Sequence, residues 1–221
     1  MNKDSIKQIC RNNLVMNKII AFGYRIAGRS LFISSKNNTL EAPLAYLWKV
    51  KLNVQGRNNK IILGRGVRIK NTVVNIYGDN NTLILEDYAR VHNSTFVLHQ
   101  NNCRIQMGKS SSAEKALFAA VEHESRIIIG EDCMISTDVE IRTSDSHKIY
   151  SSDGTRINPK RDVFIGNHVW IGAHANVLKG VTIHDGGIVG FGSILTKDIP
   201  AGYVVAGNPA VIVKKDVHWE R

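Results

Sequence analysis

The clearest pattern of apolar and polar positions has a period of six residues and runs from Ile165 to Pro200. Cut into sixes, it reads IGNHVW, IGAHAN, VLKGVT, IHDGGI, VGFGSI and LTKDIP. The first place is always aliphatic, the fifth is small or branched, and the others are mostly Gly, Asn, His, Asp or Lys. This period fits neither a helix nor simple strand alternation, so the repeat itself is the structural unit. The pattern predicts a solenoid of stacked β-coils.

The same period begins earlier and is then interrupted. From Ile129 to Ser146 the chain reads IGEDCM, ISTDVE and IRTSDS, which is enough for one triangular coil. The frame then breaks for the 18 residues from His147 to Phe164, a segment rich in Ser, Asp, Asn and Pro. We expect a loop that leaves the solenoid wall, and loops on rigid scaffolds commonly carry function.

A longer repeat precedes these hexads. The pairs Asn58-Asn59, Asn80-Asn81 and Asn101-Asn102 recur 22 and 21 residues apart, each before a run with strand alternation. Because Asn tolerates the left-handed backbone of a tight corner, the pairs predict early coils of three short strands each. Residues 109–124 look irregular.

The two ends of the chain depart from the repeats. Apolar residues at helical spacing predict one helix from about Asp4 to Ala27, with Asp4 or Ser5 as N-cap. Its basic residues are expected on a solvated face, although contact with anionic lipid is an alternative. Residues 34–50 look like a linker that covers the end of the stack. The predicted parts are an N-terminal helix and capping segment (1–50), the solenoid (51–200, with its loop at 147–164) and a C-terminal cap (201–221).

Composition limits the partners and the compartment. A formal charge of +10 and a pI near 9.6 imply an anionic partner, but no nucleic-acid motif is present and the lysines are spread along the chain. The three cysteines match no metal spacing, so we expect no metal site and reduced, buried thiols in the cytoplasm. The sequence contains no run of eighteen apolar residues and no signal-peptide pattern. We therefore expect no transmembrane segment and no secretion.

Three stretches resemble the hexapeptide-repeat acyltransferases: IGNHVWIGAHANVLKGVTI, TKDIPAGYVVAGNPAVIVK, and DSH at the opening of the loop. The part from Asp132 to Trp170 is similar to the O-acetyltransferases of sialic-acid capsules. The resemblance implies an all-β fold, namely a left-handed parallel β-helix, and a homotrimer with sites between neighbouring subunits. It also implies transfer of an acetyl group from acetyl-CoA to a hydroxyl or amine.

Acyl transfer to a sugar hydroxyl needs a base with a near-neutral pKa, which an imidazole supplies. On residues alone, His147 is one of eight histidines and reads equally as an exposed loop residue. The resemblance selects it as the catalytic base. Asp145 is a candidate to orient the imidazole, with a backbone carbonyl as the alternative. We expect His168, His174 and His184 at the surface.

The resemblance also places Trp170 beside the catalytic histidine, where an indole stacks on a sugar face. The alternative is a tryptophan buried at a subunit interface. Arg142 and Arg156 are candidates to meet acceptor carboxylates near the loop, or else ordinary surface charges.

Coenzyme A needs a groove where backbone can approach its pantetheine arm and where cations can meet its phosphates. An amide near Gly172 or Ala173 is the candidate for the thioester oxyanion. The alternative is that these glycines only turn corners. The cofactor-binding candidates are Gly172, Ala173, Gly190, Phe191, Gly192, Thr196, Lys197, Lys214 and Lys215.

The leading functional hypothesis is O-acetylation of a bacterial surface glycan, capsular or lipopolysaccharide. The positive charge favours polysialic acid or another acidic glycan. Direct transfer, with His147 as general base, is expected because no cysteine lies in the signature coil or the loop. The alternatives are an acetyltransferase of a small acceptor, such as a free sugar, an amino-sugar nucleotide, serine or an antibiotic, and a non-enzymatic β-helical scaffold.

Overall fold

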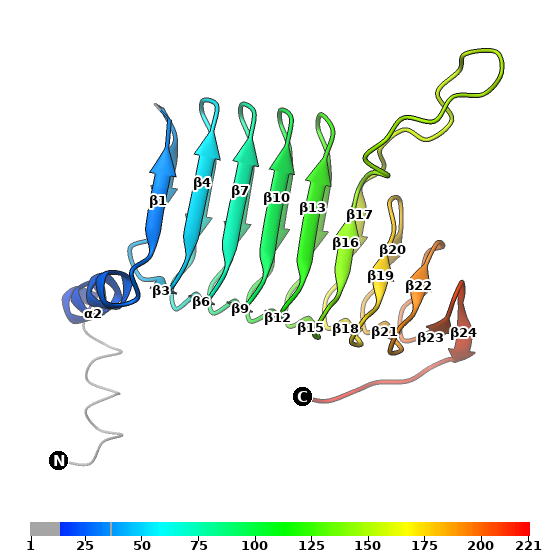
Figure 1. The fold of residues 1–221 in the computed structure, drawn as a ribbon. Helices are drawn as coiled ribbons and strands as arrows, with labels where there is room; N and C mark the ends of the chain where they lie inside the picture. The colour runs from blue at the N-terminus through cyan, green and yellow to red at the C-terminus, as the bar shows by residue number, and fades with distance from the viewer. Residues whose placement is uncertain (1–13, 36) are drawn as a thin grey trace.

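The computed structural model describes residues 14–35 and 37–221, which form one helix followed by a β-solenoid (Figure 1). The helix α2, Leu14–Ala27, ends where the sequence predicts. The earlier part of the predicted helix, with Asp4 and Ser5, lies outside the described residues. Tyr24 of α2 packs on Tyr46 and Trp48, so the helix sits at the first coil of the stack.

The solenoid has three walls, here called sheets A, B and C. Sheet A consists of β1 Leu31–Ser34, β4 Lys51–Gln55, β7 Val73–Tyr77, β10 Thr95–His99, β13 Leu117–Val121, β16 Glu140–Arg142, β19 Asn176–Val177 and β22 Ile194–Leu195. Sheet B consists of β2 Thr39–Glu41, β5 Lys60–Leu63, β8 Thr82–Leu85, β11 Arg104–Met107, β14 Arg126–Ile129, β17 Val163–Ile165 and β20 Thr182–Ile183. Sheet C consists of β3 Tyr46–Trp48, β6 Arg68–Lys70, β9 Arg90–His92, β12 Ser112–Glu114, β15 Met134–Ile135, β18 Trp170–Ile171, β21 Ile188–Val189, β23 Val204–Gly207 and β24 Ala210–Lys214.

The strands pair in parallel from one coil to the next, so the sheet order in each wall is the order of the coils. At the C-terminal end β24 turns back and pairs antiparallel with β23. The prediction of an all-β parallel helix with a helical N-terminal segment is thereby confirmed. We name the edges where the walls meet the AB, BC and CA corners.

Coil length changes along the solenoid. Lys51, Val73, Thr95 and Leu117 are in register, one coil of 22 residues apart, whereas the chain after the loop advances by 18 residues per coil and finally by 16. The long coils carry five-residue strands in sheet A and the last coils two-residue strands, so the stack narrows toward its C-terminal end (Figure 1).

Two stretches are more regular than the sequence suggested. Residues 34–50, expected to be a linker, contain β2 and β3, and with β1 these strands complete a coil paired with β4, β5 and β6. Residues 109–124, expected to be irregular, contain β12 and β13 within an ordinary coil. Both stretches lack the hexad pattern because their coils belong to the longer repeat.

Asparagine side chains join the long coils at the AB corner. The carboxamide oxygen of Asn59 accepts from the Asn81 amide at 2.8 Å, and that of Asn81 accepts from the Cys103 amide at 2.8 Å. Asn58, Asn80 and Asn102 precede these positions and turn the corner with φ of 57°, 58° and 60°. The constant spacing places Cys103, rather than Asn102, as the equivalent of Asn81. The third asparagine pair is therefore offset by one position.

The thiols of Cys103 and Cys133 are free and buried, as predicted, while Cys10 lies outside the described residues. Burial raises the pKa of both thiols, that of Cys133 to about 11. In the part of the chain that the structure describes, no helix is long and apolar enough to cross a membrane.

The asparagine ladder predicts a specific loss of stability in Asn81→Ala. The buried Asn81 side chain also donates to the Gln100 carbonyl at 2.8 Å, so the substitution leaves a buried N–H and a buried C=O without partners. We expect the free energy of unfolding in urea to fall by about 2–4 kcal/mol. As a control, Asn80→Gly at the neighbouring exposed, left-handed position changes it by less than about 0.5 kcal/mol. Equal effects of the two substitutions would contradict this role.

Candidate active site

The interruption of the hexads is an extended loop at the AB corner, between β16 and β17 (Figure 1). Two backbone bonds close its outer part, from Ser151 N to Thr155 O and from Ile157 N to Ile149 O, each at 2.9 Å. The expected end of the loop at 164 falls inside sheet B, because β17 already starts at Val163. The loop therefore leaves the solenoid without disturbing the strand pairing, since β17 after the loop pairs in register with β14 before it.

Asn158 holds the base of this loop together. Its side chain, in a residue that is 8% exposed, donates to the Asp145 carboxylate at 2.9 Å and to the His147 carbonyl at 2.8 Å. Its carboxamide oxygen accepts from the Ile149 amide at 2.6 Å. Lys179, from the following coil, donates to the Asp145 carboxylate and to the Asn158 carbonyl. One buried amide thus joins both arms of the loop.

A second contact ties the loop to the preceding coil. The Arg156 guanidinium donates to both carboxylate oxygens of Glu122, at 2.6 and 2.7 Å, and the Ser144 hydroxyl donates to the same carboxylate. The hydrogen bonds from Arg156 lower the pKa of Glu122 to about 2. Arg156, a candidate for binding acceptor carboxylates, therefore has its guanidinium on an internal carboxylate. In this chain it anchors the loop.

His147 lies where the loop begins. Ser146 adopts a φ of 66°, and the His147 amide donates to the Asp145 carbonyl at 2.8 Å, which closes a tight turn. The His147 side chain is exposed, and its ring makes no hydrogen bond to the described residues. Asp145 bonds to Lys179 and Asn158 instead, and the Lys179 bond lowers the pKa of its carboxylate. Asp145 thus positions the turn, and the imidazole is left free.

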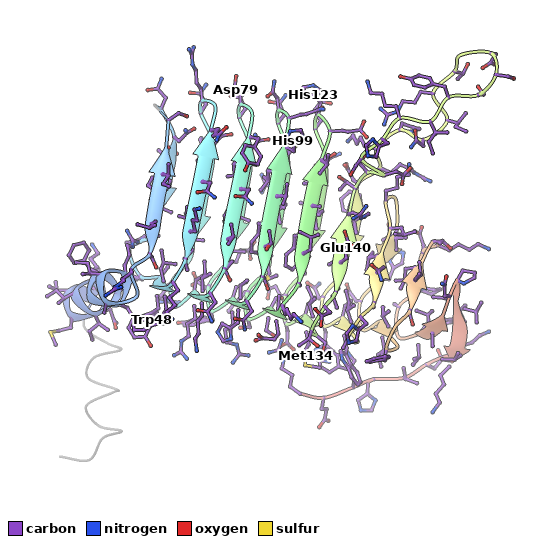
Figure 2. All side chains as sticks on the ribbon, viewed as in Figure 1. Trp48, Asp79, His99, His123, Met134 and Glu140 are labelled. Carbon is purple, nitrogen blue, oxygen red and sulfur yellow. The ribbon has the colours of Figure 1, made fainter. Side chains whose placement is uncertain are left out.

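Trp170 lies on a different wall. It is in β18 of sheet C, 38% exposed, and its register partner Met134 is visible along the lower wall in Figure 2. His123, on the AB corner one coil before the loop, is at the opposite side of the solenoid. One chain therefore does not bring Trp170 to His147, although the resemblance predicts that the two are neighbours.

The small residues of the proposed coenzyme A groove stack on the CA corner. A Cβ on Gly172 would meet the Val189 carbonyl oxygen at 2.7 Å, and Gly192 has a φ of 67°. These glycines have structural reasons to be there. The Gly172 amide already donates to Val189, so of the two oxyanion candidates the Ala173 amide is the one without an acceptor in the described chain.

The remaining candidates are dispersed. Phe191 is 74% exposed on the same CA corner, with its ring 5.0 Å from that of His174. Thr196 and Lys197 follow β22 on the AB corner, not beside the glycines. Lys214 ends β24, and the Lys215 ammonium lies 5.8 Å from the Tyr203 ring. Arg142 bonds to Glu140 within sheet A. A single chain thus gathers the glycines, Ala173 and Phe191, and leaves the cations apart from them.

The C-terminal tail forms a second cluster near Trp170. The Trp219 ring stacks on His168 at 4.1 Å and lies 6.1 Å from the Trp170 ring. The two His168 ring nitrogens face the Asp132 carboxylate and the Trp219 carbonyl, each at 2.8 Å. Arg221 continues the contact by donating to the Cys133 carbonyl at 2.7 Å. The tail is thus fastened across the BC corner.

Sequence reasoning did not identify Asn158, Lys179 or the Trp219–His168 contact. A lone asparagine in a polar loop carries no sign of burial. The pairing of His168 with Trp219 joins residues 51 positions apart and depends on the path of the tail. The only available signal was an aromatic residue placed after the repeats had ended.

The tail contact predicts a pH dependence. Both partners of the His168 ring are acceptors, so the docked imidazole is held as the cation, and the Trp219 carbonyl and then the Asp132 carboxylate raise its pKa. Docking of the tail is therefore fully stabilised below the ordinary pKa of 6.5 and weakens as pH rises through the raised value. We expect the indole N–H signal of Trp219 in NMR spectra to shift toward a free-tail position over this range. His168→Gln should remove the transition, and a transition that persists in that variant would refute the assignment.

Comparison with known proteins places this geometry in a family. The model of the bacterial transferase hexapeptide (six repeats) matches residues 162–197. A polysialic acid O-acetyltransferase of Neisseria meningitidis is 36% identical over 146 residues, 65% of this chain and 67% of that protein. One of Escherichia coli O1:K1 is 37% identical over 105 residues, 47% of this chain, and the match spans only 34% of the relative's length.

The fold agrees with these matches. The crystallographic structure of the polysialic acid O-acetyltransferase OatWY superposes with a TM-score of 0.81 at 32% identity, covering 86% of this chain and 92% of that one. The solenoid is thus a left-handed parallel β-helix. The chain belongs to the hexapeptide-repeat O-acetyltransferases.

Proposed function

We propose that this protein transfers the acetyl group of acetyl-CoA to a hydroxyl of an acidic bacterial surface glycan, with polysialic acid as the leading acceptor. The observation that carries the proposal is the loop base. Asn158, Lys179 and the Glu122–Arg156 pair fix the backbone around His147, while the imidazole itself projects without a partner in the described chain. A fixed backbone with a free imidazole suits a general base. The relatives named for polysialic acid support the acceptor class.

The proposed reaction is a single displacement. A His147 ring nitrogen accepts the proton of the glycan hydroxyl while that oxygen forms a bond to the thioester carbon. The Ala173 amide donates to the developing oxyanion. The carbon–sulfur bond then breaks, and coenzyme A leaves as a thiolate that takes up a proton. No covalent enzyme intermediate is needed.

We further propose that the site is completed by a second copy of the chain in a homotrimer. Trp170 and the CA-corner residues lie on walls away from the loop that carries His147, and a rigid solenoid cannot fold one onto the other. In a closed ring the loop of one subunit faces the wall of the next, so every site receives both parts. The dispersed cations Lys197 and Lys214 would then meet coenzyme A phosphates from different sides.

We place the reaction in the cytoplasm. The free, buried thiols of Cys103 and Cys133 suit a reducing compartment. Acetylation then precedes or accompanies export of the glycan.

A role as a non-enzymatic scaffold does not explain why the base of the loop is fastened to the coils before and after it. Nor does it explain why the His147 imidazole at that base has no hydrogen bond in the described chain. Transfer to a small acceptor is the remaining alternative. The release of the coenzyme A thiol from acetyl-CoA can be measured with polysialic acid, neutral glycans, free sugars or serine as acceptor. The acceptor that supports the fastest release separates the classes.

His147→Ala is expected to reduce kcat for acetyl transfer by at least about 100-fold, because general-base catalysis contributes on that scale. Binding of coenzyme A, measured by calorimetry, should remain within about twofold of wild type, since in the proposed step His147 acts on the glycan hydroxyl and does not hold coenzyme A. His184→Ala, which changes an exposed histidine on another coil, serves as the matched control and should keep full activity. Near-wild-type turnover of His147→Ala would refute the assignment.

A further inference from the structure

The outer face of sheet C carries one continuous row of residues that leads away from Trp170. The strand register places Trp170 beside Met134, Met134 beside Ser112, Ser112 beside Arg90, and Arg90 beside Arg68. Tyr46 follows Arg68 as the last member. Parallel strands are about 4.8 Å apart, so Arg90 is about 14 Å and Arg68 about 19 Å from Trp170 along the row.

The arginine end of the row is hollowed. A depression of about 710 Å³ is lined by Arg65, Arg68 and Arg90 together with Tyr46 and Tyr88, and none of its described lining residues is an Asp or Glu. A second hollow of about 640 Å³ adjoins it and shares Tyr46 and Arg68. The face of sheet C thus offers cations and aromatic rings in one connected groove, here called the sheet C groove.

In the described part of the chain, no contact of the Arg68 or Arg90 guanidinium stabilises the fold. Both side chains are exposed, and neither guanidinium has a hydrogen bond or ion pair within residues 14–35 and 37–221. They are direct neighbours in the ladder, and like charges in that arrangement are destabilising. Arg65 differs, because it pairs with Asp87 at 3.3 Å and lies 5.4 Å from the Tyr88 ring centre. Two unpaired arginines at neighbouring positions suit successive carboxylates of a bound polymer.

We infer that the sheet C groove binds the acceptor glycan as an extended chain, with carboxylates on Arg68 and Arg90, sugar faces on Tyr46 and Tyr88, and the reacting residue at Trp170. The inference rests on the proposed function, whose acceptor it defines as a linear polymer with repeated carboxylates. A single sugar at Trp170 does not reach the arginines. The groove therefore gives a preference for long chains over short ones.

The test compares Arg68→Gln/Arg90→Gln with a charge-matched control, Arg57→Gln/Lys60→Gln, whose residues are exposed outside sheet C. Binding of long-chain polysialic acid and of sialic acid dimer is measured by calorimetry without acetyl-CoA, and transfer to both is measured separately. Since each substitution removes one exposed ion pair with a carboxylate, we expect the two together to weaken long-chain binding and raise its KM about tenfold. Binding of the sialic acid dimer and the KM for acetyl-CoA should stay at their wild-type values in the arginine variant. The control double variant should bind long-chain polysialic acid as tightly as wild type.

Each outcome decides one question. Long-chain binding by the arginine variant at wild-type strength, or equal loss in the control, overturns the groove. Tighter binding of a single-stranded oligonucleotide or of anionic vesicles than of polysialic acid also overturns it, in favour of that ligand. If polysialic acid binds as expected but no acetyl group is transferred to any acceptor, the groove stands and the proposed function fails.

Discussion

The hydrogen-bonded register between successive coils is the constraint on which the rest of the structure depends. Each strand pairs with its equivalent one coil away, so a residue keeps its wall and its height in the stack. The chain can leave this ladder only at a corner and must return in register. The loop at the AB corner does so, since Ile127 to Ile129 of β14 pair with Val163 to Ile165 of β17 across it. The same rigidity that fixes the loop also keeps sheet C away from it.

Much of the fold could be predicted from the six-residue pattern, because the aliphatic first residue and the small or branched fifth residue of each hexad are the ones that the narrow coil buries. The long coils were harder. Their first strands, β1 to β3, lie in residues 31–48, where no hexad repeats, and only pairing with the next coil reveals them. The asparagine spacing was close to the true period, but the third pair, Asn101-Asn102, lies one position early. Cys103, not Asn102, is the residue whose amide donates to Asn81.

The candidate site, like the fold, was predicted from the sequence only in part. The loop and His147 were identified by the break in the pattern and by family resemblance. Their supports were not, since the burial of Asn158 and the pairing of Arg156 with Glu122 follow from how the loop folds back on the preceding coil. Charge alone suggested Arg156 as a ligand for the acceptor. The structure gives that arginine an internal partner and leaves Arg68 and Arg90, which the sequence did not single out, exposed on sheet C.

We propose on these observations that the enzyme is a composite of neighbouring chains, in which one subunit supplies the base and the next supplies the wall with Trp170. Mixing inactive subunits tests this claim most directly. His147→Ala and Trp170→Ala chains, each inactive alone, are unfolded together, refolded as mixed trimers and assayed for acetyl transfer. If each site takes its two residues from different chains, random mixing restores activity to about a quarter of wild type. If both residues must come from one chain, no mixture regains activity, and that result would contradict the account.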